Sequence, residues 1–161
     1  MAEKFPMTPR GLQMLKDELR RRKDVDRMRI VKAIEEARGH GDLSENADYS
    51  AAKEAQSFNE GRIKDIEVMI AFADVIDPSR LTGPKVMFGA TVQLSDPDSG
   101  DEVCYTIVGE HEADIKAGRI AITAPVARAL IGREVGDTAH VRTGKGMREY
   151  EILKVEFLAA D

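Results

Sequence analysis

Two stretches of helical periodicity, separated by a short glycine-containing break, constrain the fold of this chain more than any other feature. Before the break, apolar residues recur every three to four positions at Leu12, Leu15 and Leu19. After it, the same spacing runs from Ala52 to Ile76, and the break between them reads GHGDLSENADY. Such spacing predicts amphipathic helices, and two of them joined by a short reversal predict an antiparallel helical hairpin. With roughly thirty residues in each helix, the hairpin would be ~45 Å long.

The first helical stripe is interrupted by a charged insert at residues 21–24, which read RRKD. Apolar residues resume at Met28, Val31 and Ile34, out of step with the earlier leucines. When the apolar spacing of a helix shifts, its apolar side chains continue to face the partner helix only if the helix changes register. The sequence therefore predicts a register shift near residues 21–24.

The second half of the chain changes to the alternating period of strands. Apolar runs bounded by turn residues predict strands at 86–94, 103–108, 120–122, 139–142 and 150–157. A proline at 125 and a glycine at 132 delimit a short helix. This pattern predicts an α+β protein: a long antiparallel coiled-coil hairpin over residues 1–77, and a small antiparallel sheet domain with one short helix over residues 84–158.

Composition narrows the function classes. Charged residues make up 33 % of the 161 residues and aromatic residues only 5 %, a balance that suits long solvated helices. The net charge of −5 argues against a strongly basic nucleic-acid binder. No apolar run approaches the ~18 residues of a membrane span, so we expect a soluble, cytoplasmic protein with no membrane contact. The single cysteine, Cys104, excludes an internal disulfide, and its position in an apolar alternating run predicts a packed thiol.

Charge along the hairpin depends on position. Basic residues outnumber acidic ones from Lys16 to Lys32, whereas acids dominate from Ala33 to Asp48. One interpretation is a salt-bridged coiled coil in which the basic residues pair with acids of the returning helix, namely Glu60, Asp65, Glu67 and Asp74. The other is an electropositive face beside a phosphate backbone.

Two acids in the break, Asp42 and Glu45, also allow two interpretations. Three residues apart, they match a capping box in which Asp42, or Ser44 in its place, caps the second helix. Alternatively, they are oxygen ligands for Mg²⁺, which accepts one or two protein carboxylates and keeps several waters. Two carboxylates cannot hold the ion alone, so this second interpretation needs a partner that already holds a metal and a phosphate.

The segment GHGDLSENADYSAAKEAQ, followed by EGRIKDIE and later by FGATV and ARALIGREVGD, resembles the Gre family of bacterial transcript cleavage factors, closest to its GreA subfamily. The resemblance runs from MTPRG to ILKVEF, nearly the whole chain. It implies an N-terminal antiparallel coiled coil and a C-terminal FKBP-like domain.

The resemblance also implies a partner and a mechanism. The C-terminal domain would dock on RNA polymerase at the rim of its secondary channel, and the coiled coil would enter that channel. The tip acids would help bind a Mg²⁺ ion shared with the polymerase, whose active centre then cuts the 3′ end of backtracked nascent RNA. The factor would act as a monomer, and it would not be an enzyme by itself.

Site residues follow from the positions that match the family's motif. Asp42 and Glu45 would be the catalytic, metal-binding acids, supported by Ser44 and Asn46. The basic residues near the RNA would be Arg38 and Lys53, and the lysine would lack the two-pronged phosphate contact of an arginine. Near them, Tyr49 is expected to pack, whereas His40 and Asp48 have no assigned role.

Three other functions fit parts of the pattern. An FKBP-like half suggests a proline isomerase, but that half offers few aromatic residues to line a pocket. A Gre-like regulator that blocks the channel without promoting cleavage would share the same fold. A pure coiled-coil scaffold would have replaceable tip acids.

Overall fold

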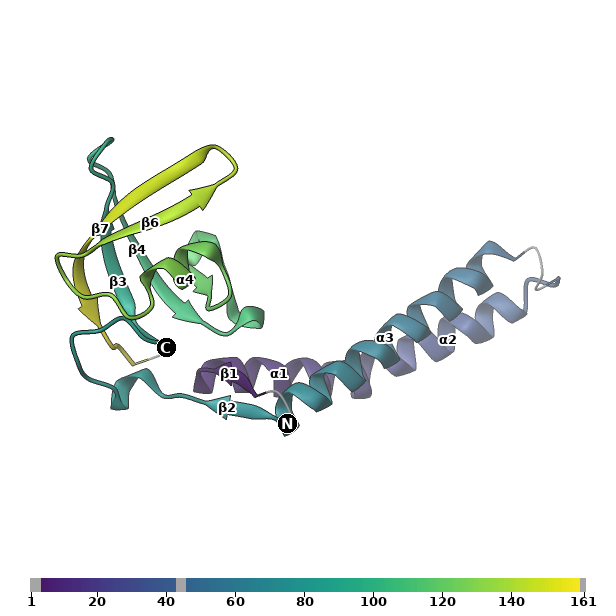
Figure 1. The fold of residues 1–161 in the computed structure, drawn as a ribbon. Helices are drawn as coiled ribbons and strands as arrows, with labels where there is room; N and C mark the ends of the chain where they lie inside the picture. The colour runs from purple at the N-terminus through teal and green to yellow at the C-terminus, as the bar shows by residue number, and fades with distance from the viewer. Residues whose placement is uncertain (1–3, 43–45, 160–161) are drawn as a thin grey trace. The chain divides into compact units, whose positions relative to one another are not determined.

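The computed structural model describes residues 4–42 and 46–159, which form two compact units (Figure 1). Residues 13–72 make the helical unit. Residues 4–12 join residues 73–159 in the sheet unit. Within the described residues, no helix is both long and apolar enough to cross a membrane.

The helical unit is the predicted antiparallel hairpin. Its first limb contains α1 (Pro9–Arg21), the π-helical turn η1 (Arg22–Asp26) and α2 (Arg27–Arg38), and its second limb is α3 (Ala47–Ala71). Helices α2 and α3 lie side by side along their length (Figure 1). Among the described residues of this unit, the buried apolar side chains form a narrow seam, a set comprising Leu15, Ile30, Ile34, Ala37, Ala52, Ile63 and Ile66.

The predicted register shift is present as the turn η1. A π-helical turn holds one residue more than an α-helical turn, so it changes the face that α2 buries. Ile30, Ile34 and Ala37 are buried, whereas Met28 and Val31 of the expected stripe are exposed, so the expectation was wrong for those two residues. The same turn places Asp26 in the interior, where its side chain is 12 % exposed. Its carboxylate lies 3.3 Å from Arg29 Nη2 and 3.7 Å from Arg21 Nε. The charged insert therefore belongs to the hairpin's structure.

The sheet unit contains one five-stranded sheet with the order β5-β4-β3-β7-β6. Its strands are β3 (Thr91–Ser95), β4 (Glu102–Val108), β5 (Arg119–Ala121), β6 (Thr138–Thr143) and β7 (Gly146–Glu156). All neighbouring pairs are antiparallel except β4 and β5, which are parallel. The expectation of a purely antiparallel sheet was therefore wrong at this edge, where two 3₁₀ turns, η3 (Glu110–Glu112) and η4 (Ile115–Ala117), carry the chain from β4 to β5.

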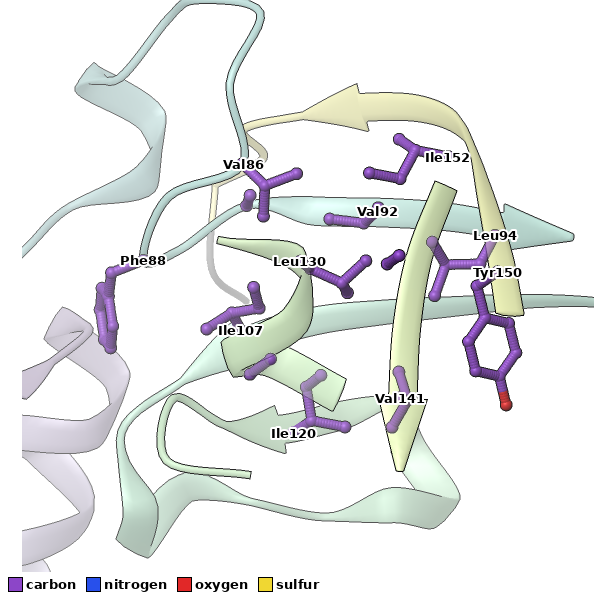
Figure 2. Packing of buried hydrophobic residues seen from close by; sticks show 13 residues of the cluster. Val86, Phe88, Val92, Leu94, Ile107, Ile120, Leu130, Val141, Tyr150 and Ile152 are labelled. Atoms are coloured by element: carbon purple, nitrogen blue, oxygen red, sulfur yellow. The ribbon is translucent and has the colours of Figure 1, made fainter. Parts of the chain in front are cut away.

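The core of the sheet unit forms where α4 (Pro125–Leu130) covers one face of the sheet. Figure 2 shows Leu130 of α4 among side chains that include Val92, Ile107, Ile120 and Ile152. The alternating pattern of the strands places these residues on one face. The predicted strands after 100 and the predicted short helix are confirmed within a few residues.

Two expectations about the sheet unit were wrong. Residues 86–90 are not strand, because Gly89 has a φ of +87° and the ladder begins only at Thr91. Val86 and Ala90 are nevertheless fully buried, so their apolar character reflects burial without strand pairing. Cys104 is exposed, because the alternation of β4 turns its neighbours on either side, Val103 and Tyr105, toward the core.

Residues 4–12 contact the rest of the sheet unit in ways that were not predicted from the sequence. β1 (Phe5–Met7) pairs in parallel with β2 (Ala73–Val75). Glu112, only 2 % exposed, accepts hydrogen bonds from the backbone N–H groups of Thr8 (3.1 Å) and Gly109 (3.0 Å) and from the Thr8 hydroxyl. A Cβ at Gly11 would lie 2.3 Å from the Glu112 carboxyl carbon, so only glycine fits beside this buried acid.

Candidate functional site: the hairpin tip

The tip connects the end of α2 to the start of α3. Gly39 ends α2 in a right-handed conformation, with a φ of −69°. Gly41 has a φ of +105°, a region that favours glycine, so it allows the chain to reverse. The structure describes Asp42 on one side of the connection and Asn46 on the other. The predicted site residues Ser44 and Glu45 lie outside the described residues.

Asn46 joins the two helices at the tip. Its Oδ1 accepts a hydrogen bond from the backbone N–H of Tyr49 (3.0 Å) and caps α3. Its Nδ2 donates to the backbone carbonyl of Ala37 in the last turn of α2 (2.5 Å). The expectation that Asp42 or Ser44 caps the second helix was therefore wrong, because α3 begins at Ala47 and Asn46 takes that position. Capping α3 does not explain why an acid stands at position 42.

A small apolar cluster lies directly behind this cap. Tyr49 packs against Ile30, Ile34 and Ala52. Tyr49 thus packs as expected, and it connects the start of α3 to the face of α2. Among the described residues, the hydrogen bonds of Asn46 and the packing of Tyr49 join the two helices next to the tip.

Exposed charges surround the tip. Arg38 ends α2, and Lys53 lies on the second turn of α3, where its Nζ donates to Gln56 Oε1 (3.0 Å). His40 Nδ1 lies 3.5 Å from Asp48 Oδ2, a contact that is an ion pair only when the histidine is protonated. This contact between residues on opposite sides of the reversal was not predicted from the sequence.

Few ligands for a divalent cation are present among the described residues of the tip. Among residues 4–42 and 46–159 no group of three or more His, Cys, Asp or Glu side chains could hold a metal ion. Carboxylate oxygens are the ligands that Mg²⁺ takes, in octahedral geometry with several waters. Asp42, with Glu45 three positions along the chain, would supply at most a minority of six ligands. The remaining ligands would have to come from another molecule.

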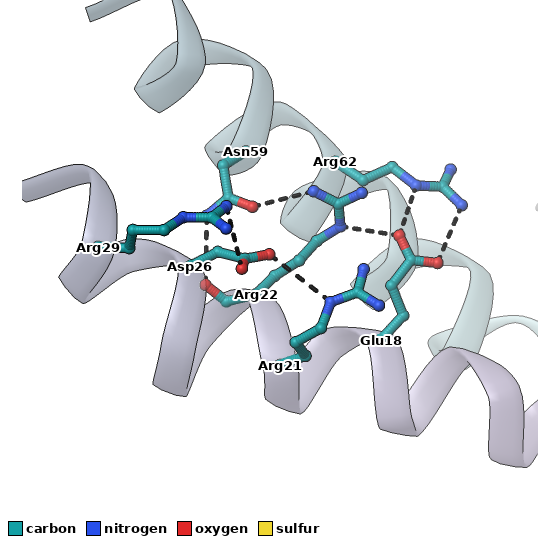
Figure 3. Close-up of polar contacts among 7 residues, drawn as sticks. All are labelled: Glu18, Arg21, Arg22, Asp26, Arg29, Asn59 and Arg62. Carbon is teal, nitrogen blue, oxygen red and sulfur yellow. Dashed lines mark hydrogen bonds and ion pairs between the residues drawn. The ribbon is translucent and has the colours of Figure 1, made fainter. Parts of the chain in front are cut away.

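A polar network stiffens the hairpin behind the tip (Figure 3). Glu18 accepts hydrogen bonds from Arg22 Nε (2.7 Å) on its own limb and from Arg62 Nε (3.1 Å) on α3. Arg22 Nη1 also donates to Asn59 Oδ1 (3.0 Å), and Asn59 Nδ2 returns a bond to the Arg22 carbonyl (3.2 Å). Burial alone would raise the pKa of Glu18, but the hydrogen bonds and charges of the two arginines outweigh it and lower that pKa.

Further ion pairs cross the hairpin. Arg27 makes two hydrogen bonds to Glu60, of 2.8 and 2.6 Å, and Lys23 Nζ lies 3.5 Å from Glu67. The hydrogen bonds from Arg27 lower the pKa of Glu60. Of the four acids expected to pair across the hairpin, Glu60 and Glu67 do so in the described structure. Several basic residues pair instead with acids of their own limb, a set of contacts comprising Arg20 with Asp17 and both Arg21 and Arg29 with Asp26.

Comparisons with known proteins agree with the resemblance seen in the sequence. The family described as "Transcription elongation factor, N-terminal" matches residues 5–75, and the family described as "Transcription elongation factor, GreA/GreB, C-term" matches residues 81–157. Proteins named transcription elongation factor GreA from Brucella canis and Brucella suis are each 58 % identical to this chain over 156 residues. These matches cover 97 % of this chain and 99 % of each relative.

Solved structures of related factors were also found. A crystal structure of GreA factor homolog 1 from Thermus thermophilus is 26 % identical, covers 96 % of this chain and 99 % of its own, and has a TM-score of 0.43. A GreA/GreB elongation factor from Nitrosomonas europaea is 32 % identical, covers 65 % of this chain and 87 % of its own, and has a TM-score of 0.42. The family assignment rests on the sequence matches, which together span both units. This chain belongs to the GreA/GreB family of transcription elongation factors.

Proposed function

We propose that this chain binds RNA polymerase at its secondary channel and stimulates cleavage of the 3′ end of backtracked nascent RNA, so that arrested complexes resume elongation. The observation that carries the proposal is the 58 % identity to GreA elongation factors over 97 % of the chain. It acts as a monomer in the cytoplasm, where the sheet unit docks on the polymerase and the hairpin enters the channel.

The chemistry needs carboxylates at the hairpin tip. Asp42 and Glu45 supply oxygen ligands that the polymerase site lacks, and Glu45 also orients the attacking water. Asp42 and Glu45 would help hold a Mg²⁺ ion, which would supply charge stabilisation for phosphodiester cleavage. In this proposal the reaction belongs to the polymerase, to which the chain adds two carboxylates, so the chain is not an enzyme by itself.

Precise placement of the two acids depends on the residues behind them. Asn46 bonds to both helices, and Tyr49 packs between them. Displacing a catalytic carboxylate by about 1 Å can lower the reaction rate on the order of 100-fold. The contacts of Asn46 and Tyr49 therefore matter for cleavage as well as for stability. Arg38 and Lys53 flank the tip and attract the RNA phosphates, a long-range effect that weakens with salt.

The test is RNA cleavage in a stalled, backtracked elongation complex. Asp42→Ala and Glu45→Ala should each keep polymerase binding and reduce stimulated cleavage at least about 100-fold, in the range seen when one catalytic charge-stabilising group is removed. Raising the Mg²⁺ concentration should restore part of the activity of each variant, because a weaker site fills at higher metal concentration.

Asp48→Ala provides the matched control, because Asp48 is also an exposed acid at the tip but follows the cap of α3. It should cleave within a few-fold of wild type. Wild-type cleavage rates for both Asp42→Ala and Glu45→Ala would exclude the metal-binding role of the tip. Loss of polymerase binding in these two variants would instead assign the acids to docking.

A further inference from the structure

The sheet unit contains a cavity of about 430 Å³ that has no role in the function proposed above. It is bordered by the first turn of α1, by β3, β4 and β5, and by the segment after β7. Its basic and polar lining consists of Arg10, Arg119, Thr8, Thr91, Thr106 and Glu112. All of these residues belong to the same compact unit, so the cavity does not depend on how the hairpin is placed.

Two arginines of this cavity have nitrogen atoms that are shielded from solvent and have no hydrogen-bond partner among the described residues. The atoms are Nη1 of Arg10 and Nε of Arg119. Buried donors are nearly always paired in folded proteins, because an unpaired one forfeits the full free energy of its hydration. Two such donors on cations lining one cavity point to an acceptor that the folded chain does not itself supply.

The acids nearby do not supply that acceptor. Glu112 already accepts three hydrogen bonds, two from Thr8 and one from Gly109. Asp114 lies 3.8 Å from Arg119 Nη2, beyond hydrogen-bonding distance, and its side chain is 51 % exposed. Neither carboxylate is a hydrogen-bond partner of Arg10 Nη1 or Arg119 Nε, so these two donors stay unsatisfied among the described residues.

Two threonines add a neutral donor to the same lining. The hydroxyl oxygens of Thr91 and Thr106 lie 2.9 Å apart. Because only one of the two hydroxyls donates in this bond, the hydrogen of the other remains available for a further acceptor. Arginine forks and hydroxyl donors together are the usual set for a phosphate or carboxylate group.

The size and the rest of the lining indicate what carries this anionic group. Pro78, Val108, Ala117 and Leu158 add apolar wall, and the volume lies within the range of small-molecule sites. From these observations we propose that the cavity binds a small organic molecule through a phosphate or carboxylate group, with the oxyanion on Arg10 and Arg119 and the apolar part against Val108 and Leu158.

Binding of simple oxyanions to the full-length chain tests this proposal. Isothermal titration calorimetry with inorganic pyrophosphate and with acetate, at matched ionic strength, would distinguish a phosphoryl ligand from a carboxylate ligand. We expect saturable binding of one of them. Arg10→Gln and Arg119→Gln should each weaken it at least about tenfold, which corresponds to about 1.4 kcal/mol. Thr106→Val, which removes only a hydroxyl, should weaken it a few-fold.

Arg142→Gln is the control for non-specific charge effects, because Arg142 is an exposed arginine of β6 that does not line the cavity. It should bind the probe as wild type does, and circular dichroism melting without ligand should establish that every variant folds. The proposal is overturned if neither probe binds saturably up to about 10 mM. It is also overturned if Arg142→Gln weakens binding as much as Arg10→Gln and Arg119→Gln do.

Discussion

At the scale of single residues, the tip depends on side chains that each bond to two partners. Asn46 is the main example, because one amide group caps α3 and also holds the last turn of α2. Glu18 plays the same part farther along the hairpin, between Arg22 and Arg62. Replacing either residue removes two contacts at once, and conservative variants separate their effects.

Replacement of Asn46 should loosen the tip without unfolding the hairpin. Asn46→Ala loses both bonds and should lower the free energy of unfolding by about 1 kcal/mol, as for a lost N-cap. Asn46→Asp keeps the oxygen that caps α3 and loses only the donor to Ala37, so it should retain most of that stability. Hydrogen exchange measured by mass spectrometry should show faster exchange in the first turn of α3 for Asn46→Ala alone. Equal exchange in both variants would contradict the capping role.

Glu18 should make the stability of the hairpin depend on pH. Because the folded state lowers the pKa of Glu18 below its ordinary value of 4.5, the stabilisation is fully present above pH 4.5 and is lost as the pH falls through the folded-state pKa. The difference in unfolding free energy between wild type and Glu18→Gln should be about 1 kcal/mol near pH 7 and should shrink below pH 4.5.

Asp17→Asn is the matched control for Glu18→Gln. Asp17 makes an exposed pair with Arg20 on the same helix, a kind of contact that contributes less than about 0.5 kcal/mol. Urea unfolding followed by circular dichroism at several pH values measures both differences. A Glu18→Gln effect that stays constant from pH 7 to pH 3 would contradict the role of its charge.

At the scale of elements, the π-helical turn η1 sets which face of α2 meets α3. An α-helix turns about 100° per residue, so the one extra residue in η1 re-aims every side chain from Arg27 to Arg38. Ile30, Ile34 and Ala37 are the buried residues of α2, and we expect their burial to depend on this rotation. The charged insert is therefore needed for its length as well as for its ion pairs.

Deletion of Lys23 should disrupt the outer half of the hairpin. Without the extra residue, α2 would turn its exposed Met28 and Val31 toward α3 and expose buried isoleucines, at a cost of several kcal/mol. The substitution Lys23→Ala keeps the length and loses only a 3.5 Å surface contact, so it should cost less than about 0.5 kcal/mol. Limited proteolysis near the tip compares the two, and equal resistance would show that the turn does not set the register.

The elements that sequence reasoning predicted are those with enough residues to show a period. The two limbs, the shift between them and the strands after residue 100 all follow from apolar spacing. β1 reads FPM and β2 reads ADV, so neither shows the continuous apolar run that marked the equally short β5. The run from Val86 to Ala90 was misassigned because burial in a loop and burial in a strand give the same apolar pattern.

At the tip, sequence reasoning predicted which residue types gather and could not assign their contacts. Asp42, Ser44 and Asn46 are all good helix caps, and the choice among them depends on where α3 begins relative to the last turn of α2. That distance is a tertiary property. That Arg10 and Arg119 line one cavity could not be predicted from the sequence either, because more than a hundred positions separate them.

At the scale of the whole molecule, the two units are stabilised by different forces. The helical unit buries a narrow seam and carries most of the charged contacts, whereas the sheet unit surrounds α4 with a continuous apolar core. Salt screens exposed charges over about 10 Å at 0.1 M and over about 3 Å at 1 M, but it does not weaken apolar burial. The two units should therefore respond differently to ionic strength.

Hydrogen exchange at 0.05 M and 1 M potassium chloride should reveal this difference. Amides in α2 and α3 should exchange a few-fold faster at high salt, because each screened surface pair loses only a few tenths of a kcal/mol. Amides in β3 and β7 should exchange at unchanged rates. If both units lost protection to the same extent, the charged contacts would not be a distinguishing source of stability for the hairpin.

The parallel pairing of β1 with β2 makes the hairpin an insertion in an otherwise continuous sheet unit. Met7 and Val75 are paired neighbours, so the chain leaves the unit and re-enters it at adjacent points. A segment whose two ends are adjacent can be replaced by another of the same kind, as a domain can be inserted at a surface loop. Adding seven residues to each limb would lengthen its reach by about 10 Å while leaving the two attachment points where they are. A graft of this kind would measure how far the hairpin must reach into the channel that we propose it enters.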